Sequence, residues 1–237
     1  MNIINKKDIH KENSLIKIRS KYILKQIFDN LKQIKLLQMI RYNKNIKNKL
    51  NINKNHYFIE YSKVIVELFP MEHQFGNFIN INDKYKSHYH IYFNDNNEER
   101  EKYSIESNEN VSKINIIIDL EVKSLSKLFK NCECLGIINF IRFNRTDFKD
   151  MSNMFNGCKT LKKINLSKFN TNNVSNMGGM FNECSSLVEL DLSNFNTINA
   201  KNMNRMFRKC SSLYELNISN FNTNNVTDMG QMFYSCS

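Results

Sequence analysis

The last 113 residues of the chain repeat one 26-residue unit four times and begin a fifth. Equivalent positions carry the same residue type in every copy: Phe129, Phe155, Phe181, Phe207 and Phe233; Cys132, Cys158, Cys184, Cys210 and Cys236; Leu135, Leu161, Leu187 and Leu213. No insertion interrupts this spacing. A fixed period of this length indicates stacked repeats, in which each unit covers the apolar face of the next.

Within one unit, two apolar patterns follow each other. Met151, Met154, Phe155 and Cys158 have the i, i+3, i+4, i+7 spacing of one helical face. The next segment, residues 161–169, alternates apolar and polar residues as a half-buried strand does. The predicted fold class is therefore α/β, a solenoid with one short helix and one strand in each 26-residue coil.

The stretch from Asn173 to Asn196 resembles the BspA-type leucine-rich repeat, and the resemblance covers residues 114–237. It implies a right-handed, curved leucine-rich-repeat solenoid that binds proteins. The first copy departs most from the pattern, because Leu125 replaces the repeated Met and Arg145 stands where the next copy has Thr171.

Two polar or weakly polar columns accompany the apolar ones. The first follows the last core Phe of each unit and consists of Asn144, Asn170, Asn196 and Asn222. We expect these amides to point inward as a structural ladder that bonds the turns of neighbouring coils. The repeated cysteines lie on the apolar face, so they are predicted to be core thiols that resist alkylation in the native protein; disulfides between coils are the alternative.

Four segments are expected along the chain. They are a disordered start (1–13), a basic helical module (14–55), a small β cap with a linker (56–110), and the repeats (111–237). The β cap rests on three runs rich in β-branched and aromatic residues, 64–69, 77–81 and 88–93. The fifth unit stops at Ser237 without a polar capping repeat, so we expect a truncated C-terminus.

The basic module resembles the F-box over residues 20–50. Its segment 21–31, followed by the Leu36–Leu37 pair, carries the pattern, although Ser20 and Lys21 replace the opening Leu-Pro. The resemblance implies binding to a ubiquitin-ligase adaptor; a plain helical cap is the other interpretation. Residues 1–63 hold 15 Lys and Arg against 4 Asp and Glu, which raises attraction to nucleic acid or anionic lipid as a further possibility. Without interleaved aromatics or a basic stripe, that possibility is disfavoured.

The N-terminus has no apolar signal-peptide core, and no window approaches the length of a membrane span. A cytoplasmic location is predicted, with the cell surface as the alternative. Enzymatic activity and cofactors are not predicted, because the repeats contain no His and the chain has no phosphate-binding glycine pattern. His88, His90, Cys132 and Cys134 have zinc-ligand chemistry, but their spacing fits no known finger, and no metal site is predicted.

Functional residues are instead expected on the strand positions between the core residues. These positions vary between units while the core does not, and the predicted partner-binding set on the concave face is Lys163, Asn165, Glu189, Asp191, Glu215 and Asn217. Variation over a constant scaffold is typical of a binding surface. The sequence thus predicts a non-enzymatic protein-interaction scaffold, with an F-box-like substrate receptor and a cell-surface adhesin as alternatives.

Overall fold

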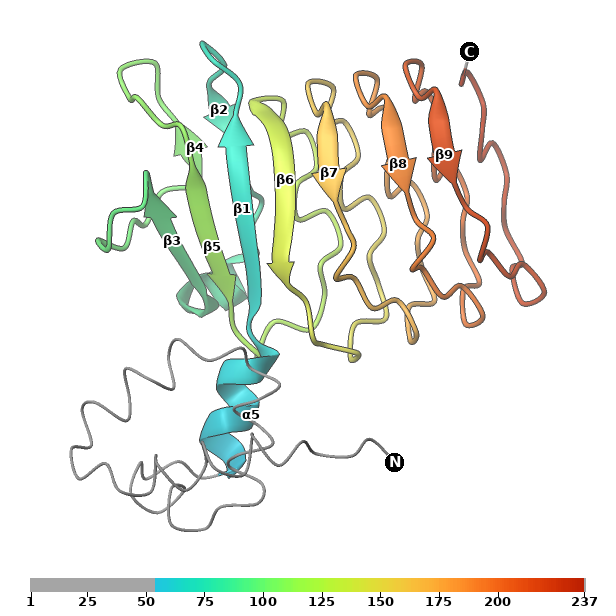
Figure 1. Cartoon of the computed structure of the whole chain (residues 1–237), viewed down its shortest axis with the longest axis horizontal. Coiled ribbons are helices and arrows are strands. Elements are labelled where there is room, and N and C mark those ends of the chain that lie inside the picture. The colour runs from blue at the N-terminus through green and yellow to red at the C-terminus, as the bar shows by residue number, and fades with distance from the viewer. Residues whose placement is uncertain (1–53, 237) are drawn as a thin grey trace, which may run out of the picture. The chain divides into compact units, whose positions relative to one another are not determined.

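A computed structural model describes residues 54–236 of the chain (Figure 1). The chain divides into two compact units, Met1–Glu60 and Tyr61–Ser237. Helix α5 (Lys54–Ser62) contains the only described residues of the first unit. The disordered start, most of the helical module and the F-box-like segment lie outside the described residues, and everything below concerns the second unit.

A five-stranded mixed sheet begins the second unit. Its strands are β1 (Val64–Pro70), β3 (Tyr89–Phe93), β5 (Ile114–Ile118), β6 (Leu135–Arg142) and β7 (Lys163–Asn165), in the order β3-β5-β1-β6-β7. Neighbours pair antiparallel except β6 and β7, which are parallel. In β1, Val64, Val66 and Leu68 are fully buried while the residues between them are half-buried. Strict alternation of this kind places one face of the sheet on the core.

Short elements complete this region. Strand β2 (Gly76–Asn77) pairs with β4 (Ser104–Ile105), and a 3-10 helix, η1 (Asp83–His88), leads into β3. The expected runs 64–69 and 88–93 form β1 and β3, whereas 77–81 contributes to the sheets only through β2. Pro70 ends β1 beside a register shift, a position at which the sheet does not need the N–H that proline lacks.

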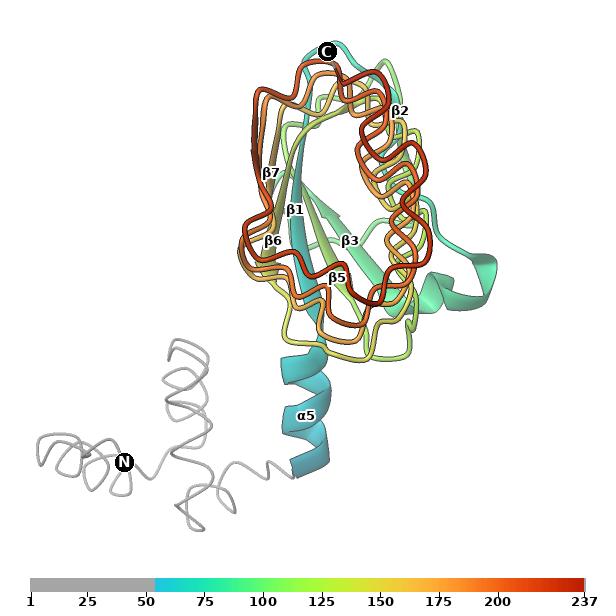
Figure 2. The same cartoon turned by 90° about the vertical axis from the view of Figure 1, so that its right-hand side faces the viewer.

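Each 26-residue unit forms one coil, and Figure 2 shows the coils one behind another. Strands β8 (Glu189–Asp191) and β9 (Glu215–Asn217) pair in parallel as a separate sheet. On another side of the coils, isolated parallel bridges join Asp150, Asn176, Asn202 and Asp228 in series. Backbone hydrogen bonds also run between coils through the apolar turns, from Phe155 N to Met180 O and from Phe181 N to Met206 O.

The prediction of an α/β leucine-rich-repeat solenoid with a helix in each coil is wrong. The described chain is mostly strands and turns, with one mixed sheet and two separate two-stranded sheets, and residues 151–158 form consecutive turns. Two positions per coil, four residues apart, have the left-handed backbone that ends a helix; Asn153 has φ 55° and Gly157 has φ 76°. Their N–H groups therefore donate to the next coil, to Gly178 O and Asn182 O, instead of to a carbonyl four residues back.

The repeated apolar residues nevertheless fill the interior. The Phe rings stack along the coils, with centroids 5.7 Å apart for Phe129 and Phe155, 5.4 Å for Phe155 and Phe181, and 5.9 Å for Phe181 and Phe207. The Cys column lies among them as free thiols, buried from Cys132 to Cys210 and half-buried at Cys236. Each thiol from Cys158 onward donates to the carbonyl of a Phe in the preceding coil.

Within residues 54–236, no helix is long and apolar enough to span a bilayer.

Candidate functional site

The six predicted partner-binding residues lie on one exposed face formed by β7, β8 and β9, here called the strand face. In each strand the two outer residues are exposed and the middle one, Ile164, Leu190 or Leu216, is partly or fully buried. Register places Glu189 opposite Glu215 and Asp191 opposite Asn217. The structure thus aligns the varied side chains in two rows across neighbouring coils.

A hollow of about 300 Å³ lies where β7 approaches β8. Its lining is Asn139, Lys163, Ile164, Asn165, Leu166, Ser167, Asp191, Ser193 and Asn194. Three of the predicted partner-binding residues therefore share one concavity. The amides and hydroxyls around it offer both donors and acceptors, which suits recognition of polar side chains or backbone.

Charge is distributed unevenly over the strand face. Lys163 is its cation, whereas Glu189, Asp191 and Glu215 are its acids. Hydrogen bonds from the backbone N–H and the side chain of Ser193 lower the pKa of Asp191, so its carboxylate remains charged well below neutral pH. The β8–β9 part of the strand face therefore presents negative charge.

The asparagine column has a different place from the one expected. Asn170, Asn196 and Asn222 are exposed or half-buried, and each side-chain oxygen accepts from the N–H two residues later in its own coil. Asn144 instead donates to Tyr61 O. Because these amides close local turns, they do not form the inward ladder between coils.

The neighbouring threonines, instead of the asparagines, bond one coil to the next. Thr171 and Thr197 are fully buried. Thr171 Oγ1 donates to Asn196 O at 3.0 Å and accepts from Asn196 N at 2.8 Å, and Thr197 repeats this pattern with Asn222. The 26-residue recurrence of Thr in the sequence was the signal that could have identified this ladder.

Arg145 occupies the same position in the first coil. Its guanidinium is buried, donates from Nε and Nη2 to Asp147 at 2.8 and 2.7 Å, and lies 4.1 Å from the ring centre of Phe148. Hydrogen bonds from Arg145 lower the pKa of Asp147 to about 2. The departure of the first copy from the repeat pattern is thus accommodated by an ion pair between a buried arginine and a partly exposed aspartate.

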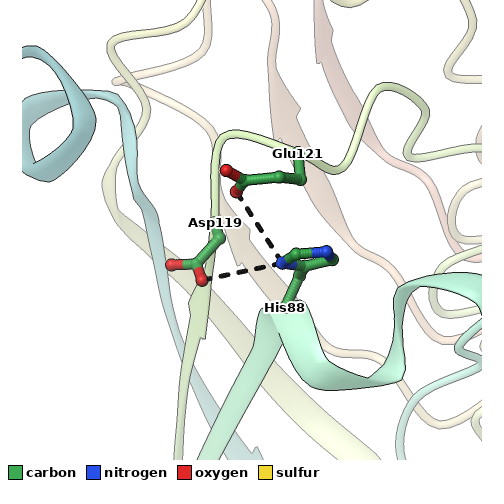
Figure 3. Close-up of side chains that lie close together, drawn as sticks. All are labelled: His88, Asp119 and Glu121. Atoms are coloured by element: carbon green, nitrogen blue, oxygen red, sulfur yellow. Dashed lines mark ion pairs between the residues drawn. The ribbon is translucent and has the colours of Figure 1, made fainter. Parts of the chain in front are cut away.

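The residues with zinc-ligand chemistry separate in the structure. Cys132 and Cys134 are buried, and the thiol of Cys134 faces Asn77 O at 3.3 Å. His88 instead lies beside Asp119 and Glu121, as Figure 3 shows. This cluster was missed because its acids follow β5 while His88 precedes β3, and only the antiparallel pairing of the two strands joins them.

His90 extends the cluster along β3. Its Nδ1 lies 3.0 Å from Glu99 Oε1 and its Nε2 lies 3.1 Å from Asp119 Oδ2. Burial by itself would lower the pKa of His90, but the hydrogen bonds to Asp119 and Glu99 outweigh it, and the pKa is raised.

Comparison with known proteins gives one family. Residues 123–237 match the model of a family described as "Mycoplasma protein of unknown function, DUF285", so the repeats are similar to that family. No curated protein and no solved structure matches the chain. The similarity thus covers the coils and does not extend to β1–β5. The resemblance to BspA-type repeats stays a prediction.

Proposed function

We propose that the chain is a non-enzymatic scaffold that binds a protein partner on the strand face. The observation that carries this proposal is the alignment of six exposed, varied side chains over a core that is repeated from coil to coil. A surface that changes while its support stays constant is suited to selecting one partner by its pattern of charge and hydrogen bonds.

The pairing of two acids supports a function beyond folding. Glu189 lies directly opposite Glu215 in the β8–β9 register, and like charges at opposed strand positions lower stability. A partner with basic side chains would relieve this repulsion on binding. We therefore expect the partner to be cationic where it contacts β8 and β9, and polar where it enters the hollow beside β7.

The thiols of the repeats support a non-enzymatic role. Burial raises the pKa of Cys158 and of Cys210 to about 12, and it raises the pKa of Cys184 well above the usual value. Because the thiolate is the reactive form, these thiols are poor nucleophiles at neutral pH.

Site-specific photo-crosslinking tests the proposal. A photoreactive residue replaces Asn165 on the strand face or, as the control, Lys168, which is exposed in the same coil beyond β7. In cells that express the full chain, we expect a discrete protein adduct from position 165 and none from position 168. Equal adducts from both positions would contradict a defined binding face.

Charge variants add a second measurement. The double variant Glu189→Gln, Glu215→Gln should weaken capture of that adduct partner by about tenfold, since each carboxylate contributes to attraction of a cationic surface. The control Glu133→Gln, Glu183→Gln removes the same charge from outside the strand face, where the acids pair with Lys159 and Lys209. Indistinguishable capture by the two double variants would refute the assignment of the partner to the strand face.

The F-box-like and adhesin hypotheses remain alternatives that no described residue supports. The F-box-like segment, residues 20–50, lies outside the described residues. Copurification of a ubiquitin-ligase adaptor with the full chain tests the first hypothesis. Removal of the chain from intact cells by added protease tests the second, together with the proposed cytoplasmic location.

A further inference from the structure

The half-exposed face of the β3–β5 ladder gathers histidines and acids at one end. Alternation in β3 buries Tyr89, Ile91 and Phe93, so His88 and His90 point to the opposite face. Asp119 follows the last residue of β5, and its backbone N–H donates to His88 O at 3.0 Å. The end of the ladder therefore holds His88 and Asp119 side by side, and Glu121 reaches them from the next turn (Figure 3).

Three donor atoms converge there. His88 Nδ1 lies 4.0 Å from Asp119 Oδ2 and 3.7 Å from Glu121 Oε2, and all three ligand atoms lie within 4.8 Å of one another. A tetrahedral ion with bonds of about 2.1 Å separates its ligand atoms by about 3.4 Å. Small side-chain rotations would thus bring the three donors onto one ion.

The surroundings of Asp119 favour an ion on one of its two oxygens. Oδ2 is fixed by the hydrogen bond with His90 Nε2, and a ligating carboxylate commonly has such support. Oδ1 is buried without a hydrogen bond and faces Lys63 Nζ at 3.7 Å. The ammonium group is nearest to Oδ1, so Oδ2 is the oxygen that remains for a second cation.

We propose that His88, Asp119 and Glu121 bind a divalent transition-metal ion of the zinc type, with His90 positioning Asp119. One imidazole nitrogen and two carboxylate oxygens match the ligand preferences of Zn²⁺ and leave a fourth position for water. Calcium fits less well, because it takes six to eight oxygen ligands. The ion ties the beginning of β3 to the turn after β5, so it stabilises the folded protein.

Titration of the full chain with zinc tests the proposal. Isothermal calorimetry measures the stoichiometry and affinity of binding, and thermal unfolding measures the stabilisation. The variants are His88→Asn and Glu121→Gln, which alter partly exposed side chains and leave the core intact. The control is His73→Asn, which removes an exposed histidine at φ 59°, a backbone conformation that Asn tolerates. Circular dichroism confirms that each variant is folded.

We expect the wild type and His73→Asn to bind one more Zn²⁺ ion than His88→Asn, and to unfold at a higher temperature when zinc is added. Glu121→Gln should bind this ion at least about tenfold more weakly. Equal zinc stoichiometry and affinity in the wild type and His88→Asn would overturn the proposal. So would a calcium-induced stabilisation as large as that of zinc and unchanged in His88→Asn, since it would show general attraction of cations to the acids.

Discussion

Truncation of one stacked ring measures how much each coil depends on its neighbours. Phe181 is fully buried, with Phe155 on one side at 5.4 Å and Phe207 on the other at 5.9 Å between ring centres. Replacing a core Phe with Ala costs about 3–5 kcal/mol, and stacked pairs add to the effect of burial. We therefore expect Phe181→Ala to lower the free energy of unfolding by about 4–5 kcal/mol.

Phe233 is the matched control, since it continues the same column in the last coil. Phe233 remains 49% exposed, and within residues 54–236 Phe207 is the one aromatic ring stacked on it, at 5.5 Å between ring centres. Because Phe233 has about half the burial of Phe181 and one stacked neighbour instead of two, Phe233→Ala should lower the free energy of unfolding by about 2 kcal/mol. The difference between the two variants isolates the contribution of the interior position.

Urea denaturation followed by circular dichroism provides the measurement, and unchanged m-values permit the two variants to be compared. For a unit of this size, the midpoint of thermal unfolding should fall by about 8–20 °C for Phe181→Ala and by about 4–8 °C for Phe233→Ala. Equal losses in the two variants, or a cost below about 2 kcal/mol at Phe181, would refute the view that stacked rings hold the coils together.

Three further outcomes are expected. Cys184 should react with iodoacetamide at least about 100-fold more slowly than half-buried Cys236 in the native protein, and equally fast in urea, because burial raises the pKa of Cys184; mass spectrometry of labelled peptides measures both rates. Asp147, whose pKa is lowered from 3.8 to about 2, contributes stability above pH 4 that is lost as pH falls toward 2; after allowance for its 39% exposed side chain, this contribution is about 1 kcal/mol. In urea titrations, the difference in free energy of unfolding between the wild type and Asp147→Asn should therefore decrease from pH 4 to pH 2. Thr197→Val should cost about 1–3 kcal/mol in the same titrations, because the backbone N–H and C=O of half-buried Asn222 lose their bonds to the hydroxyl. Thr223→Val, at the equivalent but exposed position, should be nearly neutral.

The sequence predicted which repeated apolar side chains face inward, but not the backbone that carries them. Met151, Met154 and Phe155 are all fully buried, as their spacing indicates. The same spacing arises in a helix and in successive three-residue turns, because both return a side chain to the interior every three or four residues. The residues with left-handed backbone distinguish the turns from a helix. Two of these residues are glycines, Gly157 and Gly179, one at each of the two left-handed positions of a coil, and they were the signal for turns in the sequence.

Of the two candidate sites, the sequence predicted one and missed the other. The strand face follows from alternation within single strands, so sequence alone places Glu189 and Glu215 at its surface. The histidine–acid cluster depends on a pairing between β3 and β5, with residues 94–113 between the two strands, and local pattern does not determine such a pairing. The prediction of an asparagine ladder was wrong for a different reason. A repeated amide can form hydrogen bonds in a local turn or between coils, and only the geometry distinguishes the two.

The hydrogen bonds between the turns have an electrical consequence. The peptide group that joins Met180 to Phe181 accepts from Phe155 N through its carbonyl and donates through its N–H to Met206 O, and the pattern continues in the next coil with Phe207 N and Met232 O. Peptide groups linked head to tail polarise one another, and their dipoles add along the common direction. This column of turns therefore has an electrical polarity, with its N–H groups directed toward the C-terminal coil, and each hydrogen bond in the column strengthens the next.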